Sequence, residues 1–134
     1  MSAVSEFLQK HEEILAELAD TYDDGTYAIY GSEQDMSLGS FPCIGLFVGT
    51  PIISRDAISY VPVEYTFILT CADLYDQDKV GDQIAKQYSM YDLMEDVISK
   101  MGFSAITNAE PMISIASGEG SFITGWTILI KYNA

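Results

Sequence analysis

Residues 61–71 constrain the fold more than any other segment, because their side chains alternate strictly along the chain. One set is large and apolar: Val61, Val63, Tyr65, Phe67 and Leu69. The set between them is more polar: Pro62, Glu64, Thr66, Ile68 and Thr70. A period of two is typical of a strand that buries one face. The segment therefore predicts a long strand, and its proline predicts that the strand begins at a sheet edge.

Other segments also have the pattern of strands. Residues 27–30 form a short candidate, and residues 41–48 form an apolar run entered through Pro42. Residues 111–116 and 121–132 flank a glycine-containing turn, which is typical of a hairpin. In the second arm one face carries Phe122, Thr124, Trp126, Ile128, Ile130 and Tyr132.

Two segments have helical periodicity. Residues 5–22 place apolar side chains three and four residues apart, with Ser5 as the expected cap: Phe7, Leu8, Ile14, Leu15, Leu18 and Tyr22. Residues 83–101 repeat the pattern and end at Gly102, and their expected buried stripe has Val97 alongside it: Ile84, Tyr88, Tyr91, Met94, Ile98 and Met101.

These elements predict a single α+β domain over residues 1–134. A mostly antiparallel sheet of four or five strands, with two helices packed on one face, would bury both helical stripes. The polar stretch 31–40 and the acidic stretch 73–82 are expected to be loops.

The formal net charge of −14 excludes several partners. With six basic residues against twenty acidic ones, the chain is a poor candidate for gripping nucleic acid or an anionic membrane. The N-terminal residues do not have the pattern of a secretory signal, and no apolar run is long enough to span a bilayer. We therefore expect no membrane contact.

The residue types that carry chemistry are sparse. Cys43 and Cys71 are most simply free thiols packed in strands, with a disulfide or a reactive thiol as the less favoured alternatives. His11 is the single histidine, which excludes histidine pairs, and it is expected at the edge of the helix's packed face.

The acids of 73–82 resemble a calcium loop only in part, because Val80 and Gln87 stand where that loop needs ligands. The simpler interpretation is a solvated loop whose last acid, Asp82, caps the following helix. We therefore expect no cofactor, no metal and no catalytic residue. A hydrolase using two acids and a metal remains a minor alternative.

Four segments together resemble a known family: FPCIGLFVG, VPVEYTFILTCADLYD, IAKQYSMYDLMEDVISKM and TGWTILIKY. Their order and hydrophobic pattern are similar to those of the tail terminator and tail-completion proteins of long-tailed bacteriophages and prophages. The resemblance covers roughly residues 5–132, and the polar stretch 31–40 departs from it.

The resemblance implies a structural protein without catalytic residues. Such proteins form a ring, often a hexamer, that ends the tail tube and faces the head–tail connector, while DNA passes through without being specifically bound. The expected location is the virion tail or neck, and the host cytoplasm during assembly. The alternative is a small cytoplasmic protein-binding or regulatory domain without catalytic activity.

Tyrosine-rich and edge-strand positions are the candidate contacts with other subunits. The nine tyrosines suit a surface buried against another chain, or equally the margin of a small core. Open strand edges are expected near two prolines, and the aromatic return strand could fill a neighbour's groove. The candidate contact residues are Pro42, Pro62, Tyr65, Phe122 and Trp126.

Overall fold

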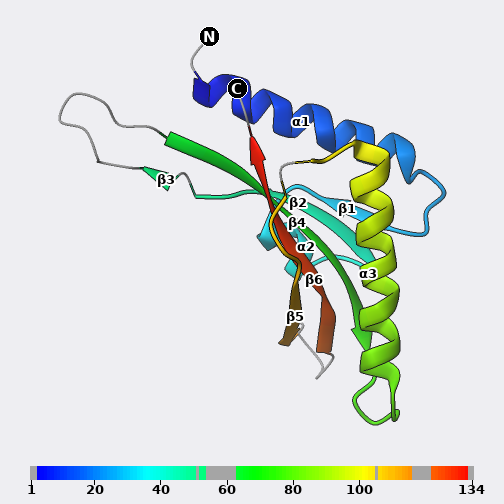
Figure 1. Cartoon of the computed structure of the whole chain (residues 1–134). Coiled ribbons are helices and arrows are strands. Elements are labelled where there is room, and N and C mark those ends of the chain that lie inside the picture. Colours follow the sequence, from blue (N-terminus) through cyan, green and yellow to red (C-terminus); the bar gives the residue numbers. More distant parts are fainter. Residues whose placement is uncertain (1–2, 51, 54–62, 105, 116–121, 133–134) are drawn as a thin grey trace.

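A long central strand, β4 (Val63–Tyr75), organises the sheet of the computed structural model (Figure 1). The strand order is β1 (Ala28–Tyr30), β2 (Cys43–Val48), β4, β6 (Phe122–Tyr132) and β5 (Glu110–Ile115). A short strand, β3 (Ile52–Ile53), also pairs with the beginning of β4. The structure describes residues 3–50, 52–53, 63–104, 106–115 and 122–132. Within them β1 and β2 run parallel and the other pairs are antiparallel, which confirms the α+β class.

The alternating segment is a strand, as predicted, but the strand is longer than expected. β4 pairs with β6 in an unbroken register from Tyr65 opposite Tyr132 to Tyr75 opposite Phe122. The start of the stretch 73–82 is therefore strand and not loop, because β6 extends far enough to pair with it. The expected hairpin is also present as β5 and β6, while its turn lies outside the described residues.

Three helices are described where two were expected. They are α1 (Ala3–Thr21), α2 (Glu33–Ser37) and α3 (Asp82–Met101). α1 begins before Ser5, so this serine lies within the helix and is not its cap. α3 ends as predicted at Gly102, whose N–H donates to the Ile98 and Ser99 carbonyls. Its left-handed backbone lets the next N–H, that of Phe103, donate back to the Ile98 carbonyl at 3.1 Å.

α2 was missed because it is one short turn within the polar stretch 31–40. Its first turn is closed by Ser32, whose hydroxyl accepts a hydrogen bond of 3.2 Å from the Asp35 N–H. Met36 points inward and is buried. Five residues are too few for a hydrophobic period to be visible in the sequence.

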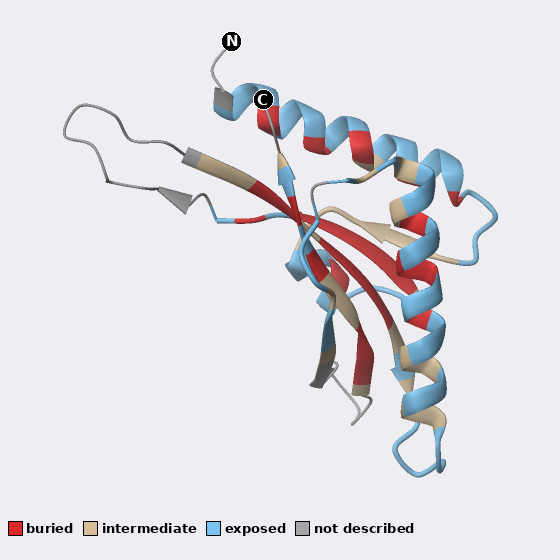
Figure 2. Ribbon diagram, viewed as in Figure 1, coloured by how far each residue is buried: buried red, intermediate tan, exposed pale blue. Residues whose placement is uncertain are grey.

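The main core lies between the two long helices and one face of the sheet (Figure 2). α1 contributes Phe7, whose ring lies 4.7 Å from that of Phe67 and 4.9 Å from that of Tyr65. The buried members of this core are Phe7, Ile14, Leu18, Tyr22, Ile44, Leu46, Phe67, Leu69, Cys71, Met90, Leu93, Met94, Val97, Ile128 and Ile130. Both long helices therefore bury an apolar stripe against the same strands.

A smaller core lies on the opposite face of the sheet, where α2 packs. Met36 joins side chains of β2, β4 and β6, and the buried members are Met36, Cys43, Phe47, Ala72 and Ile123. α2 is drawn behind the strands in Figure 1, opposite α3. None of the described helices is long and apolar enough to cross a membrane.

Candidate interaction surfaces

The sheet face opposite α1 and α3 carries no charge over its central part. Side chains alternate between faces, so every second residue of the three central strands belongs to it. We call the following twelve residues the uncharged sheet face: Cys43, Gly45, Phe47, Thr66, Ile68, Thr70, Ala72, Leu74, Ile123, Gly125, Thr127 and Leu129. Charged side chains occur beyond its ends, where Lys131 lies 3.6 Å from Glu64, and at its margins. There Glu110 of β5 is opposite Thr127, and α2 carries Glu33 and Asp35.

The uncharged sheet face is partly open, because α2 covers one part of it. A groove of about 380 Å³ lies beside α2. Its lining includes Phe47, Ile68, Thr127 and Met112 of β5, together with Met36 and the acidic Glu33 of α2. Next to it Leu129, directly opposite Ile68 in the register, is 40% exposed. In the sequence, Ile68 belongs to the more polar set of the alternating strand, and Leu129 lies on the face of residues 121–132 opposite Trp126. A large apolar residue at each of these positions was the signal that could have predicted an apolar surface here.

The helical side of the molecule carries most of the acids. Asp20 and Glu17 are exposed on α1, and Glu95 and Asp92 are exposed on α3. Further exposed acids of these two helices and the adjoining turns are Glu6, Glu12, Glu13, Asp23, Asp24, Asp76, Asp78 and Asp96. Acids thus crowd the helical side, whereas on the other side of the sheet the three central strands are uncharged and acids lie at the margins, on α2 and β5.

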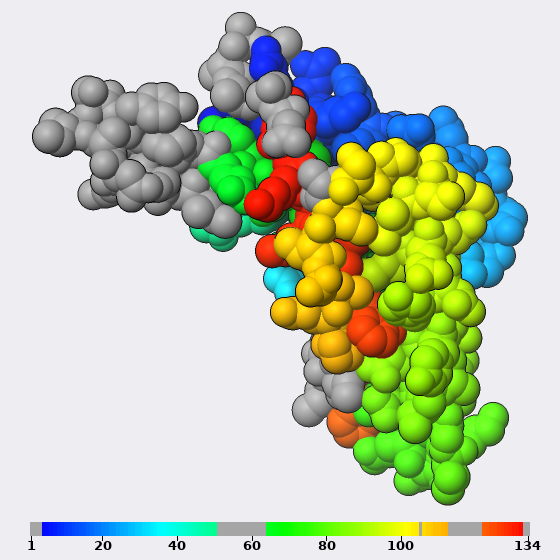
Figure 3. Space-filling view, in the orientation of Figure 1, coloured from blue at the N-terminus to red at the C-terminus, as the bar shows by residue number. Residues whose placement is uncertain are grey.

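α3 exposes an apolar ridge formed by the first three residues of its predicted buried stripe, so the prediction is wrong for this half of the helix. It is confirmed for the other half, where Met94 and Val97 are buried and Ile98 and Met101 pack against the core. Ile84 is 56% exposed, Tyr88 is 69% exposed and Tyr91 is 36% exposed, and we call these three residues the α3 ridge. The helix also buries Met90 and Leu93, which the prediction did not include. Both sets have helical spacing, and the sheet covers the set that faces β4 and β6. α3 (green to yellow) runs along the surface in Figure 3.

The predicted open edge at Pro42 is wrong, because β2 is an inner strand. β1 pairs with it on one side and β4 on the other, and the Pro42 carbonyl accepts a hydrogen bond of 3.1 Å from the Ala28 N–H. Pro62 lies outside the described residues. The outer strands of the described sheet are β1 and β5, and β5 contains Pro111, which suits an edge.

The three aromatic candidates, Tyr65, Phe122 and Trp126, pack within their own chain and are half-buried. Tyr65 lies on Phe7, as described above, and the Phe122 ring stacks on that of Tyr75 at 5.7 Å. Trp126 donates its indole N–H to the Gln87 carbonyl at 2.9 Å, and its ring meets that of Tyr91 edge-on at 5.2 Å. Whether these residues also contact another subunit remains a prediction.

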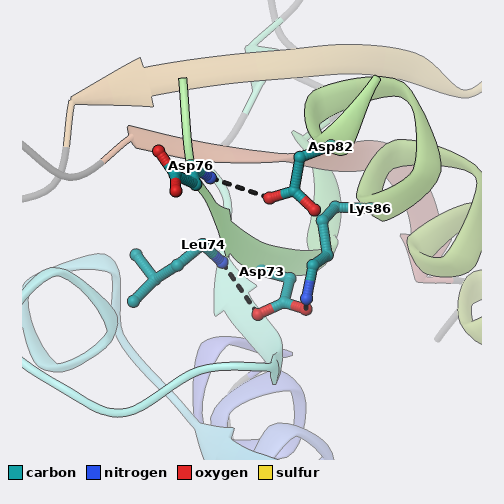
Figure 4. Close-up of polar contacts among 5 residues, drawn as sticks. All are labelled: Asp73, Leu74, Asp76, Asp82 and Lys86. Carbon is teal, nitrogen blue, oxygen red and sulfur yellow. Dashed lines mark hydrogen bonds and ion pairs between the residues drawn. The ribbon is translucent and has the colours of Figure 1, made fainter. Parts of the chain in front are cut away.

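The acids between β4 and α3 hold the junction through local contacts (Figure 4). Asp82 is the first residue of α3 and not its cap, which is Gly81. Its carboxylate turns back and accepts a hydrogen bond of 2.8 Å from the Asp76 N–H. Asp73 accepts 2.8 Å from the Leu74 N–H and lies 3.6 Å from the Lys86 ammonium. Among the described residues, no three His, Cys, Asp or Glu side chains are grouped to hold a metal ion.

The single histidine and the two cysteines are buried. His11 lies between α1 and β2, inside the packed face and not at its edge, and its Nε2 is 2.6 Å from the Leu46 carbonyl oxygen. Cys43 and Cys71 are free thiols, as predicted, and they belong to the cores on opposite faces of the sheet. Burial raises the pKa of the Cys43 thiol to about 12, and it also raises the pKa of Cys71.

Two further hollows lie on the helical side. One of about 300 Å³ lies between α1 and the end of α3, and its lining includes Lys10, Phe67 and Tyr132. The other, of about 360 Å³, lies between α3 and the segment 106–109, beside Tyr91 of the α3 ridge. The apolar surface of the ridge therefore continues into a hollow.

Comparison of the sequence with protein-family models and with curated proteins finds no match.

Proposed function

We propose that this chain is a structural subunit of a phage or prophage tail, of the tail terminator or tail-completion type. Copies would assemble into a ring at the end of the tail tube and join it to the head–tail connector. The order of helices and strands and the hydrophobic pattern of residues 5–132 support this proposal through their resemblance to those proteins.

The absence of charge from the central strands of one sheet face is the observation that carries the proposal. Two chains of net charge −14 repel each other, so copies can associate only through surfaces from which acids are excluded. The uncharged sheet face meets that requirement with twelve residues on three adjacent strands. An uncharged, partly apolar sheet face does not contribute to the solubility of a chain. Such a surface is typical of a protein interface.

The acidic helical side fits the passage of DNA through such a ring. Phosphate groups are repelled by carboxylates, and DNA affinity depends on clustered lysine and arginine side chains. Lys86 and Lys100, two of the few cations on this side, lie 3.6 Å from Asp73 and 3.0 Å from Asp96 respectively. DNA would therefore pass without being held. The proposed place of the protein is the virion tail or neck, and the host cytoplasm during assembly.

The molar mass of the purified chain tests the proposal. Multi-angle light scattering over a wide concentration range, alone and with a tail-tube protein from the same phage or prophage, should give a ring mass or a complex with the tube. Assembly should strengthen as salt is raised, because salt screens the repulsion between acidic subunits. A monomer at every concentration that also fails to bind the tube would overturn the proposal. A one-to-one complex with a non-structural protein would support the protein-binding alternative instead.

A further inference from the structure

We infer that the α3 ridge is the docking site for an amphipathic helical segment of another protein, one that carries lysine or arginine beside its apolar anchors. This inference goes beyond the proposed ring and does not depend on it. It rests on the apolar side chains that α3 leaves exposed, on the hollow next to them, and on the charge that surrounds both.

The ridge belongs to a stripe that follows one line along α3. Residues spaced four, three and four apart form the stripe: Ile84, Tyr88, Tyr91 and Glu95. Residues at this spacing lie above one another on a helix. Neighbouring exposed apolar side chains mark interaction sites, whereas single scattered ones do not, and Ile84 and Tyr88 are 56% and 69% exposed. The stripe thus offers apolar contacts along the helix and then a carboxylate.

A hollow beside the stripe has room for an anchoring side chain. It measures about 360 Å³ between α3 and the segment 106–109, and its lining includes Tyr91, Met94 and Ile98 of α3. On its other wall Ile106 is 40% exposed. A helix that docks in a groove inserts apolar side chains at the same three- and four-residue spacing that the stripe has. The ridge and the hollow together therefore fit an amphipathic helix.

The charge around the ridge identifies the chemistry of the partner. Glu95 lines the hollow and accepts a hydrogen bond from the Tyr91 hydroxyl, and Asp92 is exposed beside them. Within the described parts of the chain neither carboxylate has an ion pair, because the two lysines of α3 are paired with other acids.

A lysine or arginine next to the apolar anchors of a partner would therefore gain an ion pair at Asp92 or Glu95. A second copy of this chain, with its net charge of −14, would be repelled instead. A polycation without apolar side chains would leave the ridge uncovered. The partner that satisfies both the acids and the ridge is an amphipathic segment that is also basic.

Selection from a random-peptide yeast-display library on the immobilised full chain tests the inference. The enriched peptides should combine apolar residues at helical spacing with lysine or arginine. Synthetic peptides of those sequences are then titrated with the chain by fluorescence anisotropy. Their affinity should fall as salt is raised, because salt screens the attraction to the acids. No enrichment, enrichment of peptides without basic residues, or equally tight binding of polylysine would overturn the inference.

Variants of the chain test whether the selected peptides bind the ridge. Tyr88→Ala removes an exposed anchor and should weaken binding by about tenfold or more. Asp92→Asn should weaken binding about two- to fivefold and reduce its salt dependence, as expected for one exposed ion pair. The matched controls on α1 are Leu8→Ala, at 46% exposure, and Glu12→Gln, and both should bind normally. Circular dichroism verifies that each variant is folded.

The result can be separated from that of the proposed function. Ring assembly should strengthen with salt, whereas peptide binding should weaken. Binding that is unchanged by Tyr88→Ala would overturn the inference and leave the proposed ring standing. A chain that stays monomeric and binds no tube, but binds the selected peptides through the ridge, would overturn the proposed function and support the inference.

Discussion

The hydroxyl of Tyr22, next to the end of α1, donates a hydrogen bond of 2.7 Å to Oδ2 of Asp96 in α3. The ammonium of Lys100 lies 3.0 Å from the same carboxylate oxygen and 5.1 Å from the centre of the tyrosine ring. One tyrosine thus joins the two long helices at the rim of the core. Burial, followed by the bond to Asp96, raises the pKa of Tyr22, and the same bond is the main cause of the lowered pKa of Asp96.

Tyr22→Phe should lower the free energy of unfolding by about 1 kcal/mol, because it removes this hydrogen bond and keeps the buried ring. The value is expected at the low end for a bond to a charged group, since the Asp96 side chain is 45% exposed. Urea denaturation followed by circular dichroism measures the difference. Tyr27→Phe, in a half-buried ring beside Tyr22, is the matched control and should have a smaller effect.

The contribution of this contact should depend on pH in the direction set by Asp96. A carboxylate whose pKa is lowered by folding stabilises the protein above its unfolded pKa, about 3.9, and loses that effect as pH falls. The stability difference between wild type and Tyr22→Phe should therefore be full near neutral pH and shrink in acid. A difference that stayed constant down to the acid limit would contradict the assigned bond.

The sequence predicted the strands well because their signal is local. β4 and β6 alternate over their whole length, and the face they bury against the helices contains Phe67, Leu69, Ile128 and Ile130, as the alternation requires. Pro42 misled the assignment of sheet edges, since a proline can also begin an inner strand whose neighbour pairs from the next residue onward. Whether a strand lies at the edge or in the centre of a sheet depends on its pairing with segments far away in the sequence. The sequence of one segment does not contain that information.

The candidate surfaces could be predicted only in part. α3 is apolar on two of its sides, with Met90 and Val97 on one and Ile84 and Tyr88 on the other. Both stripes satisfy helical spacing, so the sequence could not tell which one the sheet covers. The net charge of −14 by itself implies that contacts between copies are depleted of acids, but which residues share a sheet face is decided by the register of the strands.

His11→Leu should destabilise the protein by about 1–3 kcal/mol, because it leaves the Leu46 carbonyl without its donor inside the core. A carbonyl can only accept, so Nε2 of His11 carries the proton in this 2.6 Å contact. His11→Gln keeps an N–H donor and should recover part of the loss. Equal urea midpoints for the leucine and glutamine variants would show that packing, and not the hydrogen bond, accounts for the effect.

Trp126→Phe should lower the stability of the monomer by about 1–2 kcal/mol, because the bond to Gln87 and the edge-on contact with Tyr91 are lost. Urea denaturation followed by far-UV circular dichroism measures it, at concentrations too low for assembly. An unchanged monomer whose assembly is weakened would instead assign the tryptophan to the subunit contact. Tyr91→Leu keeps the bond to Gln87 and removes the ring contact together with the hydrogen bond between Tyr91 and Glu95. Tyr91→Phe, which removes only the latter bond, is its control.

Gly125→Ala should be among the most damaging single changes, because β6 approaches β4 closely at this residue. A methyl group there would collide with the Cys71 carbonyl oxygen and would lie 2.8 Å from Ala72 Cα, and both atoms belong to the backbone. Overpacking of this kind costs about 1–3 kcal/mol or more, since backbone cannot turn aside as a side chain can. Gly25→Ala is the matched control: its φ of +80° strains alanine, but nothing lies within 4 Å. That strain alone costs about 1–2 kcal/mol. Thermal unfolding should rank Gly125→Ala below Gly25→Ala, and the reverse order would contradict the close approach of the two central strands.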